Sequence, residues 1–225
     1  MNGPISIATV AALALAARQR RSGSKQLDPQ IRQKLAELTV ASPDGRRQAA
    51  ELMASLTGKS TPLLDLRGVD LSNREIHGVD LSNTDLTDAN LNGAEFMGSS
   101  FEGAVLRGAN LEGAALAETT CTGADFTKAR AGGADFQYAD MDQTNLTDAD
   151  FSESWLEQTN FDQAVAIRTN FSKAVLLGTT LHFATCKAVN FTAAQYNTEV
   201  WVDGPCSDYV VETLKSQGSV TNEWE

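Results

Sequence analysis

The side chains that could do chemistry in this 225-residue chain are three cysteines, two histidines and many carboxylates. His77 and His182 occupy outward positions of the five-residue sequence repeat described below. In the stacked coils that this repeat predicts, the two side chains lie about five coils apart, so they cannot share a metal ion. The sequence contains no zinc-ligand spacing, phosphate-binding loop or nucleophile elbow. The carboxylates are expected on convex surfaces, without a concave site to desolvate them. We therefore expect no enzyme activity, no metal site and no cofactor.

The repeat that positions these side chains has a period of five. Leu or Phe recurs at every fifth residue over long stretches between Leu66 and Phe191, and the register continues to Tyr196 and Trp201. A helix needs apolar residues about 3.6 apart and a half-buried strand needs them two apart, so the period fits neither. Small residues lie two positions earlier, Asp or Asn stands between, and two turn-forming residues follow. Each unit is a very short strand and a corner, which can bury its apolar side chains only by stacking in a solenoid.

The repeats ANLNG, ADFTK, ADFQY, TNLTD, ADFSE, TNFDQ, TNFSK and VNFTA resemble those of the pentapeptide-repeat family. The resemblance covers residues 64–201. It implies an all-β solenoid, a right-handed quadrilateral β-helix with four pentapeptides in each of about seven coils. At about 4.8 Å per coil, the rod would be roughly 30–35 Å long.

Residues twenty positions apart should then stack inside the solenoid. The large side chains predict core columns that leave no room for a ligand. One column contains Phe151, Phe171 and Phe191, and another contains Leu66, Leu86, Leu106, Phe126 and Leu146.

The cysteine pattern predicts no disulfide framework. Cys121 and Cys186 fall on the large-residue register and are expected to be buried, about three coils apart and too far to bridge. Cys206 lies outside the repeats. A reducing compartment is therefore favoured, which predicts a cytoplasmic protein. The alternatives are membrane association through the N-terminal residues and, as the family resemblance implies, a plastid or thylakoid location. The family resemblance also fits a cyanobacterial source.

Four segments divide the chain. Residues 1–26 form an apolar and basic leader, in which the run from Ile5 to Ala17 precedes Arg18, Arg20 and Arg21. Through residues 5–21 the leader is expected to dock on a partner or to make a peripheral membrane contact; a processed targeting segment and simple packing or disorder are the alternatives. Residues 27–60 predict a helical hairpin cap, and residues 61–201 the solenoid. Residues 202–225 predict a C-terminal cap, with a short helix capped by Ser207 that forms a lid on the last coil. The family resemblance implies that such a helix can instead make a dimer, so a monomer and a homodimer both remain open.

Charge is unevenly distributed. Residues 1–60 contain nine Lys and Arg and four Asp and Glu, whereas residues 61–225 contain nine and 25, a formal charge of −16. An acidic rod repels nucleic acid and can compete for basic protein surfaces. The sequence favours a noncatalytic protein–protein interaction scaffold oriented or tethered by its leader, with a protein partner of unknown identity. The alternative, suggested by the resemblance, is a DNA-mimicking modulator of a type II topoisomerase such as gyrase.

One outward cluster departs from the polar pattern. Trp155 and Val175 should lie one coil apart on one face of the rod, with Leu177 beside them. An exposed Trp with two aliphatic neighbours is typical of a side-chain cluster that anchors an interface. The alternatives are that the C-terminal segment covers the cluster or that it is exposed without a partner. Val165 and Ile167 form a smaller rival patch on the opposite face.

Overall fold

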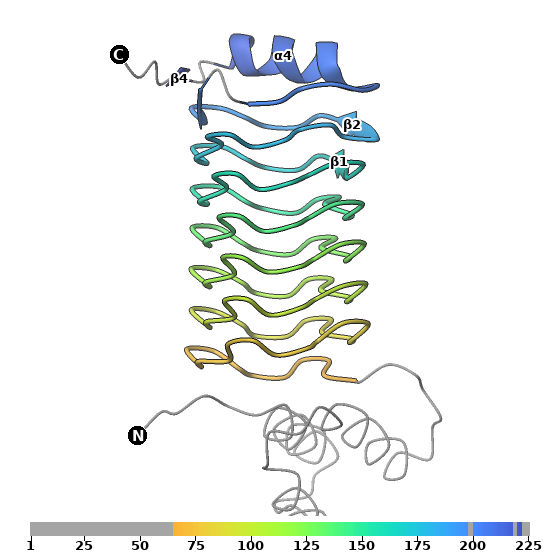
Figure 1. Ribbon diagram of the computed structural model, residues 1–225, viewed down its shortest axis with the longest axis vertical. Helices are drawn as coiled ribbons and strands as arrows, with labels where there is room; N and C mark the ends of the chain where they lie inside the picture. The colour runs from red at the N-terminus through yellow and green to blue at the C-terminus, as the bar shows by residue number, and fades with distance from the viewer. Residues whose placement is uncertain (1–64, 198–199, 218–219, 222–225) are drawn as a thin grey trace, which may run out of the picture.

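The computed structural model describes residues 65–197, 200–217 and 220–221. The predictions for the leader (1–26), including Arg18, Arg20 and Arg21, and for the helical hairpin cap (27–60) lie outside these residues. The described part of the chain forms a stack of coils followed by one helix, as Figure 1 shows.

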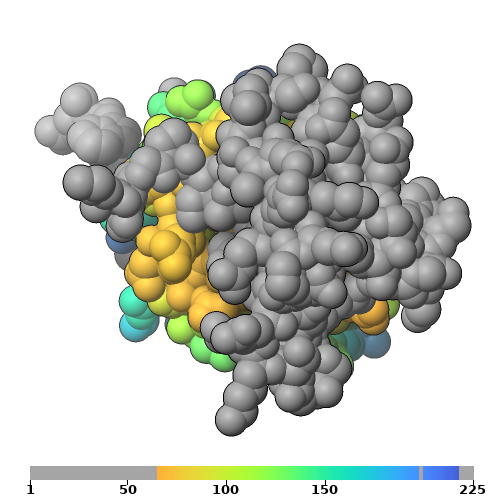
Figure 2. Space-filling view, turned by 90° about the horizontal axis from the view of Figure 1, so that it is seen from below, coloured from red at the N-terminus to blue at the C-terminus, as the bar shows by residue number. Residues whose placement is uncertain are grey.

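Each coil contains four five-residue repeats. Parallel bridges join residues twenty apart, as between Asp65 and Asp85 and between Asn170 and Asn190. The chain therefore returns to the same face after every four corners. Figure 2 looks along the stack from the end where the described residues begin, with the first coil in yellow-orange and later coils behind it.

Regular secondary structure is confined to the C-terminal part of this stack and the segment beyond it. Strand β1 (Val165–Ile167) pairs in parallel with β2 (Thr185–Lys187). Strand β3 (Gln195–Tyr196) pairs in parallel with β4 (Val220–Thr221), and the helix α4 (Ser207–Ser216) lies between them in sequence. The other repeats make isolated bridges, because each contributes only one outward residue to a ladder before the chain turns.

The corners depend on a left-handed residue at the last position of most repeats. Gly93 and Gly113 have φ angles of 62° and 63°, and polar residues such as Asp148 adopt 59° at the same position. The Asp or Asn earlier in the repeat stabilises the corner. Asp125 Oδ1 accepts a hydrogen bond of 3.0 Å from the Thr127 backbone N–H, and Asp150 does the same for Ser152. These side chains therefore stabilise the turn directly rather than only facing water.

The interior is filled by the large residue of each repeat. The Phe151 and Phe171 rings stack with centroids 5.7 Å apart, and Phe171 and Phe191 with centroids 5.5 Å apart. The following side chains of the other column have no exposed surface: Leu66, Leu86, Leu106, Phe126 and Leu146. Backbone N–H groups of the large residues donate to carbonyl groups of the next coil, so packing and hydrogen bonding follow the same axis.

Phe183 is the one Phe outside the five-residue register, and it is nevertheless fully buried. Its ring packs 6.2 Å from that of Phe161 and 6.4 Å from that of Phe171. The neighbouring register positions hold the smaller Ala166 and Cys186, which face each other across the β1–β2 pair. We infer that Phe183 turns inward to supply the volume that these two residues do not.

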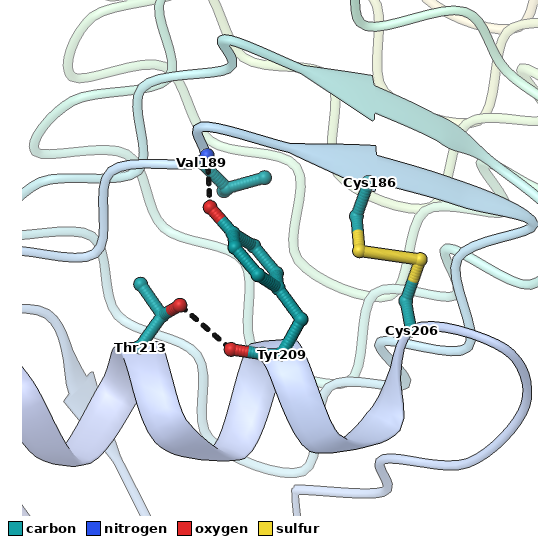
Figure 3. The surroundings of a disulfide bond; sticks show 5 residues. All are labelled: Cys186, Val189, Cys206, Tyr209 and Thr213. Carbon is teal, nitrogen blue, oxygen red and sulfur yellow. Dashed lines mark hydrogen bonds between the residues drawn. A yellow bond between two sulfur atoms is a disulfide. The ribbon is translucent and has the colours of Figure 1, made fainter.

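The prediction of no disulfide is wrong. Cys186 and Cys206 form a disulfide with Cα atoms 6.0 Å apart, and Cys186 is partly rather than fully buried. The repeat register gave no position to Cys206. The chain turns back over the last coil, and this brings the start of α4 beside β2 (Figure 3). Cys121 is a buried free thiol, as its register predicts.

Helix α4 covers the C-terminal end of the solenoid. Val210 and Leu214 are buried against the core, and the Tyr209 hydroxyl accepts a hydrogen bond of 2.9 Å from the Val189 N–H. Phe171 donates its N–H to Asn190 of the next coil, whereas Phe191 donates to the Gln217 side chain at 2.6 Å. The Gln217 side chain thus takes the place of a next-coil carbonyl group and ends this column of backbone hydrogen bonds. The predicted Ser207 cap is wrong, because Cys206 is the N-cap and no side chain caps the helix.

Candidate interaction surface

The outward side chains of one solenoid face differ from those of the other three. Its bridge column runs through Glu75, Glu95, Ala115, Asp135, Trp155, Val175 and Gln195. We call it the apolar face and define its apolar members as Met97, Ala115, Ala117, Tyr138, Trp155, Val175 and Leu177. Among the described residues, three of the four exposed large apolar side chains lie here: Met97 (47% exposed), Tyr138 (56%) and Trp155 (49%). The fourth, Trp201, bridges Thr180 on an adjacent face.

Trp155 and Val175 are adjacent on this face. They form a parallel bridge, and the Leu156 N–H donates to the Val175 carbonyl at 2.8 Å. Leu177 follows in the same repeat as Val175, and its carbonyl accepts a bond of 2.8 Å from the Gln158 N–H. Val175 and Leu177 are both half-buried. The three residues proposed from the sequence are therefore neighbours.

The described part of the C-terminal segment leaves Trp155 exposed. Strand β4 pairs with β3 at Gln195 and Tyr196, one coil beyond Val175. Trp155, a further coil away, keeps 49% of its surface exposed. Strand β4 therefore leaves Trp155 uncovered.

Sequence reasoning missed that Met97, Ala117 and Tyr138 belong to the same face. Met97, Ala117 and Leu177 follow the large residue of their repeats and differ by multiples of twenty in number. Reading each outward position with a period of twenty would have found them. Tyr138 occupies a left-handed corner position with φ of 59°, where the repeat normally holds Gly or a polar residue.

Charge on the apolar face is almost all negative. Its outward positions contain no Lys or Arg among the described residues; Arg74, nearby in the first coil, is at an inward register position and is exposed. The opposite face holds five cations: Arg67, Arg107, Lys128, Arg168 and Lys187. There Arg107 pairs with Asp125 and Arg168 pairs with Asp148, each at 2.5 Å. The two opposite faces therefore differ in charge balance.

Three carboxylates flank the exposed aromatic residues without a Lys or Arg partner in the described part of the chain: Glu118, Asp135 and Glu157. Burial raises the pKa of Glu157, a hydrogen bond from the Gln137 amide lowers it, and the charge of Asp135 raises it further. The net rise shows that nearby groups do not fully stabilise the ionised carboxylate.

The described residues contain no group of three His, Cys, Asp or Glu side chains placed to hold a metal ion. His77 pairs with Glu95 at 3.3 Å and His182 with Asp162 at 2.9 Å, each on the outer surface. Helices in the described ranges are also too short or too polar to cross a membrane.

A family model described as pentapeptide repeats matches residues 65–103, 94–130, 104–148, 126–163 and 144–182. The chain belongs to the pentapeptide-repeat family. Its fold is therefore the right-handed quadrilateral β-helix of that family, whose members are generally noncatalytic. This confirms the resemblance drawn from the repeat sequences.

Several solved structures are similar to this pentapeptide-repeat protein. HetL of Nostoc sp. strain PCC 7120, involved in heterocyst differentiation regulation, is 22% identical over 65% of this chain and 65% of its own, with a TM-score of 0.40. QnrB1, a plasmid-mediated fluoroquinolone resistance protein, is 23% identical over 72% and 92%, with a TM-score of 0.43. A thylakoid-lumen protein of Arabidopsis thaliana is 27% identical over 45% and 67%, with a TM-score of 0.29. No curated protein matches the chain.

Proposed function

We propose that this pentapeptide-repeat protein is a noncatalytic protein–protein interaction scaffold that receives its partner on the apolar face. The observation that carries the proposal is the half-exposed Trp155 beside Val175 and Leu177, on the face that also exposes Met97 and Tyr138. Residues 1–26 orient or tether the scaffold, with a peripheral membrane contact through residues 5–21 as one form of tether. The proposal requires no cofactor and no nucleic acid.

The physical basis is the contrast between a stiff core and this exposed surface. Backbone hydrogen bonds and stacked rings connect successive coils, so a partner would meet side chains whose positions are already set. Large exposed aromatic side chains with aliphatic neighbours contribute strongly to binding when a partner desolvates them. A rod of about seven coils would present such a surface along roughly 30–35 Å. We propose a cytoplasmic location, with a membrane or a plastid or thylakoid as the alternative. The Cys186–Cys206 disulfide removes the cysteine argument that favoured a reducing compartment, because such bonds persist in oxidising ones.

The test compares partner recovery by Trp155→Asp and Ile167→Asp proteins with that by the unchanged chain. Ile167 lies half a coil away, on the opposite face, so its substitution is the control for adding a negative charge at an apolar position. We expect Trp155→Asp to lose the partner and Ile167→Asp to keep it, with similar unfolding midpoints. Light scattering on the same samples decides between monomer and homodimer. Equal recovery by all three proteins would require withdrawing the apolar face as the binding surface.

DNA mimicry of a type II topoisomerase is the second candidate, favoured by the formal charge of −16 on residues 61–225. The cations on the face opposite the apolar face interrupt the polyanionic surface that a mimic of duplex DNA would present, so we rank it below the scaffold. Purified protein in a gyrase supercoiling assay separates the two. Inhibition at low micromolar concentration that weakens with added salt would favour mimicry.

A further inference from the structure

The apolar face has a charge pattern that restricts what can cover it. Glu118, Asp135 and Glu157 surround the exposed aromatic residues, and no described Lys or Arg pairs with them. A second copy of the same face would bring like charges together, which opposes self-association. A fitting occupant is apolar and carries positive charge.

The chain itself contains a segment with this chemistry. Residues 1–27 include four basic residues and no acidic residue. The thirteen residues from Ile5 to Ala17 are mainly apolar, and Arg18, Arg20 and Arg21 follow directly. None of these residues belongs to the repeat.

The connection is long enough for the segment to reach the face. Trp155 lies four bridge steps from Glu75 along the same column, roughly 20 Å at about 4.8 Å per step. Residues 22–64 join the arginines to the first described residue, and even partly compact chain of that length spans such a distance, at roughly 3.3 Å per extended residue.

We propose that residues 5–21 of the same chain occupy the apolar face, with the apolar run over Trp155, Val175 and Leu177 and the arginines beside Glu118, Asp135 and Glu157. A partner would then bind by displacing the leader, so the leader regulates the scaffold as well as orienting it. The inference rests on the proposed function, because it assigns a regulator to the same binding face.

The raised pKa of Glu157 agrees with this occupant. Burial makes the ionised carboxylate less stable, and an arginine placed nearby would reverse that effect. The charged positions also suit substitution. Glu118 occupies a left-handed corner (φ 60°), where Arg168 stands elsewhere (φ 56°), and Glu157 occupies the repeat position of Arg107. Arginine can therefore replace either glutamate without a new backbone conformation.

The experiment uses the full chain with the photoreactive residue p-benzoylphenylalanine at position 177, and at position 167 as the control. Leu177 and Ile167 occupy equivalent positions of repeats on opposite faces, and both are half-buried. We expect irradiation to cross-link position 177 to a peptide from residues 1–21 within one molecule, and position 167 to give no such product. Arg18→Glu/Arg20→Glu/Arg21→Glu should lower the yield about tenfold, the combined effect of three exposed ion pairs. Adding Glu118→Arg/Glu157→Arg to that variant should restore it.

Three outcomes of the cross-linking overturn the inference, and two further outcomes separate it from the proposed function. Equal cross-linking from both positions would show a nonspecific leader, and a cross-linked dimer would show that the leader of a second copy is the occupant. Failure of the charge exchange to restore the yield would remove the electrostatic basis. If no leader cross-link forms but Trp155→Asp still loses the partner, the proposed function stands and this inference fails. If the cross-link forms but partner recovery does not depend on Trp155, the leader occupies the apolar face, but the proposed function fails and the leader's role as its regulator fails with it.

Discussion

Breaking the Cys186–Cys206 disulfide should release α4 from the end of the solenoid. The bond closes a chain segment of twenty residues. In the chain-entropy description, a loop of that length stabilises the closed form by about 3 kcal/mol. Cys206→Ser should therefore lower the free energy of opening the cap by about 3 kcal/mol.

The loss should be local, because each coil of a solenoid contacts only its neighbours. Hydrogen exchange at the Phe191 amide measures it, since Gln217 beyond α4 accepts that N–H. The reference is the amide of Phe151, two coils before Phe191, which donates its N–H to the Asn170 carbonyl. We expect faster exchange at Phe191 and little change at Phe151.

Two matched variants provide the control. Cys186→Ser and the double variant should each cost about as much as Cys206→Ser, because all three remove the same cross-link. Additive losses would mean that the two side chains act separately. Unchanged protection of Phe191 in all three variants would refute the view that the disulfide holds the cap closed.

The remaining predictions concern the core, the turns and the thiols. Phe171→Ala removes a ring packed against those of Phe151, Phe161, Phe183 and Phe191, and it should lower the free energy of unfolding in urea by about 3–5 kcal/mol. Asp150→Ala loses one hydrogen bond within the turn and one between coils, and it should lower that free energy by about 1–2 kcal/mol. Equal losses would contradict the inward register. Stability should decrease as the pH falls through the lowered pKa values of three carboxylates, because the folded state favours their ionised form. Hydrogen bonds from Ser72 lower the pKa of Asp70, and a hydrogen bond from Arg168 lowers the pKa of Asp148. Burial raises the pKa of Asp125, but hydrogen bonds from Thr127 and Arg107 outweigh that effect and lower it. Acid titration of the unfolding midpoint checks this, and a midpoint independent of pH below about 4 would contradict it. Native, unreduced protein should show no reactive thiol at neutral pH, since burial raises the pKa of Cys121 to about 12. Denaturation without reductant should expose one thiol, that of Cys121. Three thiols after denaturation would exclude the Cys186–Cys206 disulfide.

Much of the fold follows from the sequence because the repeat is local and strict. A large apolar residue at every fifth position can be buried only if the chain turns once per repeat. The period therefore predicts the inward positions of Phe151, Phe171 and Phe191 without any long-range information. The spacing of Trp155 and Val175 likewise places them one coil apart, since twenty residues return the chain to the same face.

The role of Asp and Asn was only partly predictable. Their position between two inward residues indicates exposure to solvent, but not the bond from the Asn170 amide to Asp150 Oδ1, 2.8 Å away in the preceding coil. Such bonds depend on how two coils are aligned, which the composition of one repeat does not specify.

The sequence alone determined the repeat period, the inward register and the acidic character of the rod, because these depend on residue type and spacing within a few positions. Only the tertiary structure decided the features at the end of the rod, where the repeat stops. The disulfide partner of Cys186, the inward turn of Phe183 and the Gln217 side chain that ends the ladder all depend on where the chain folds back over the last coil. The exposure of Met97, Tyr138 and Trp155 was likewise decided by the tertiary structure, because it depends on what the neighbouring coils and the end of the chain cover.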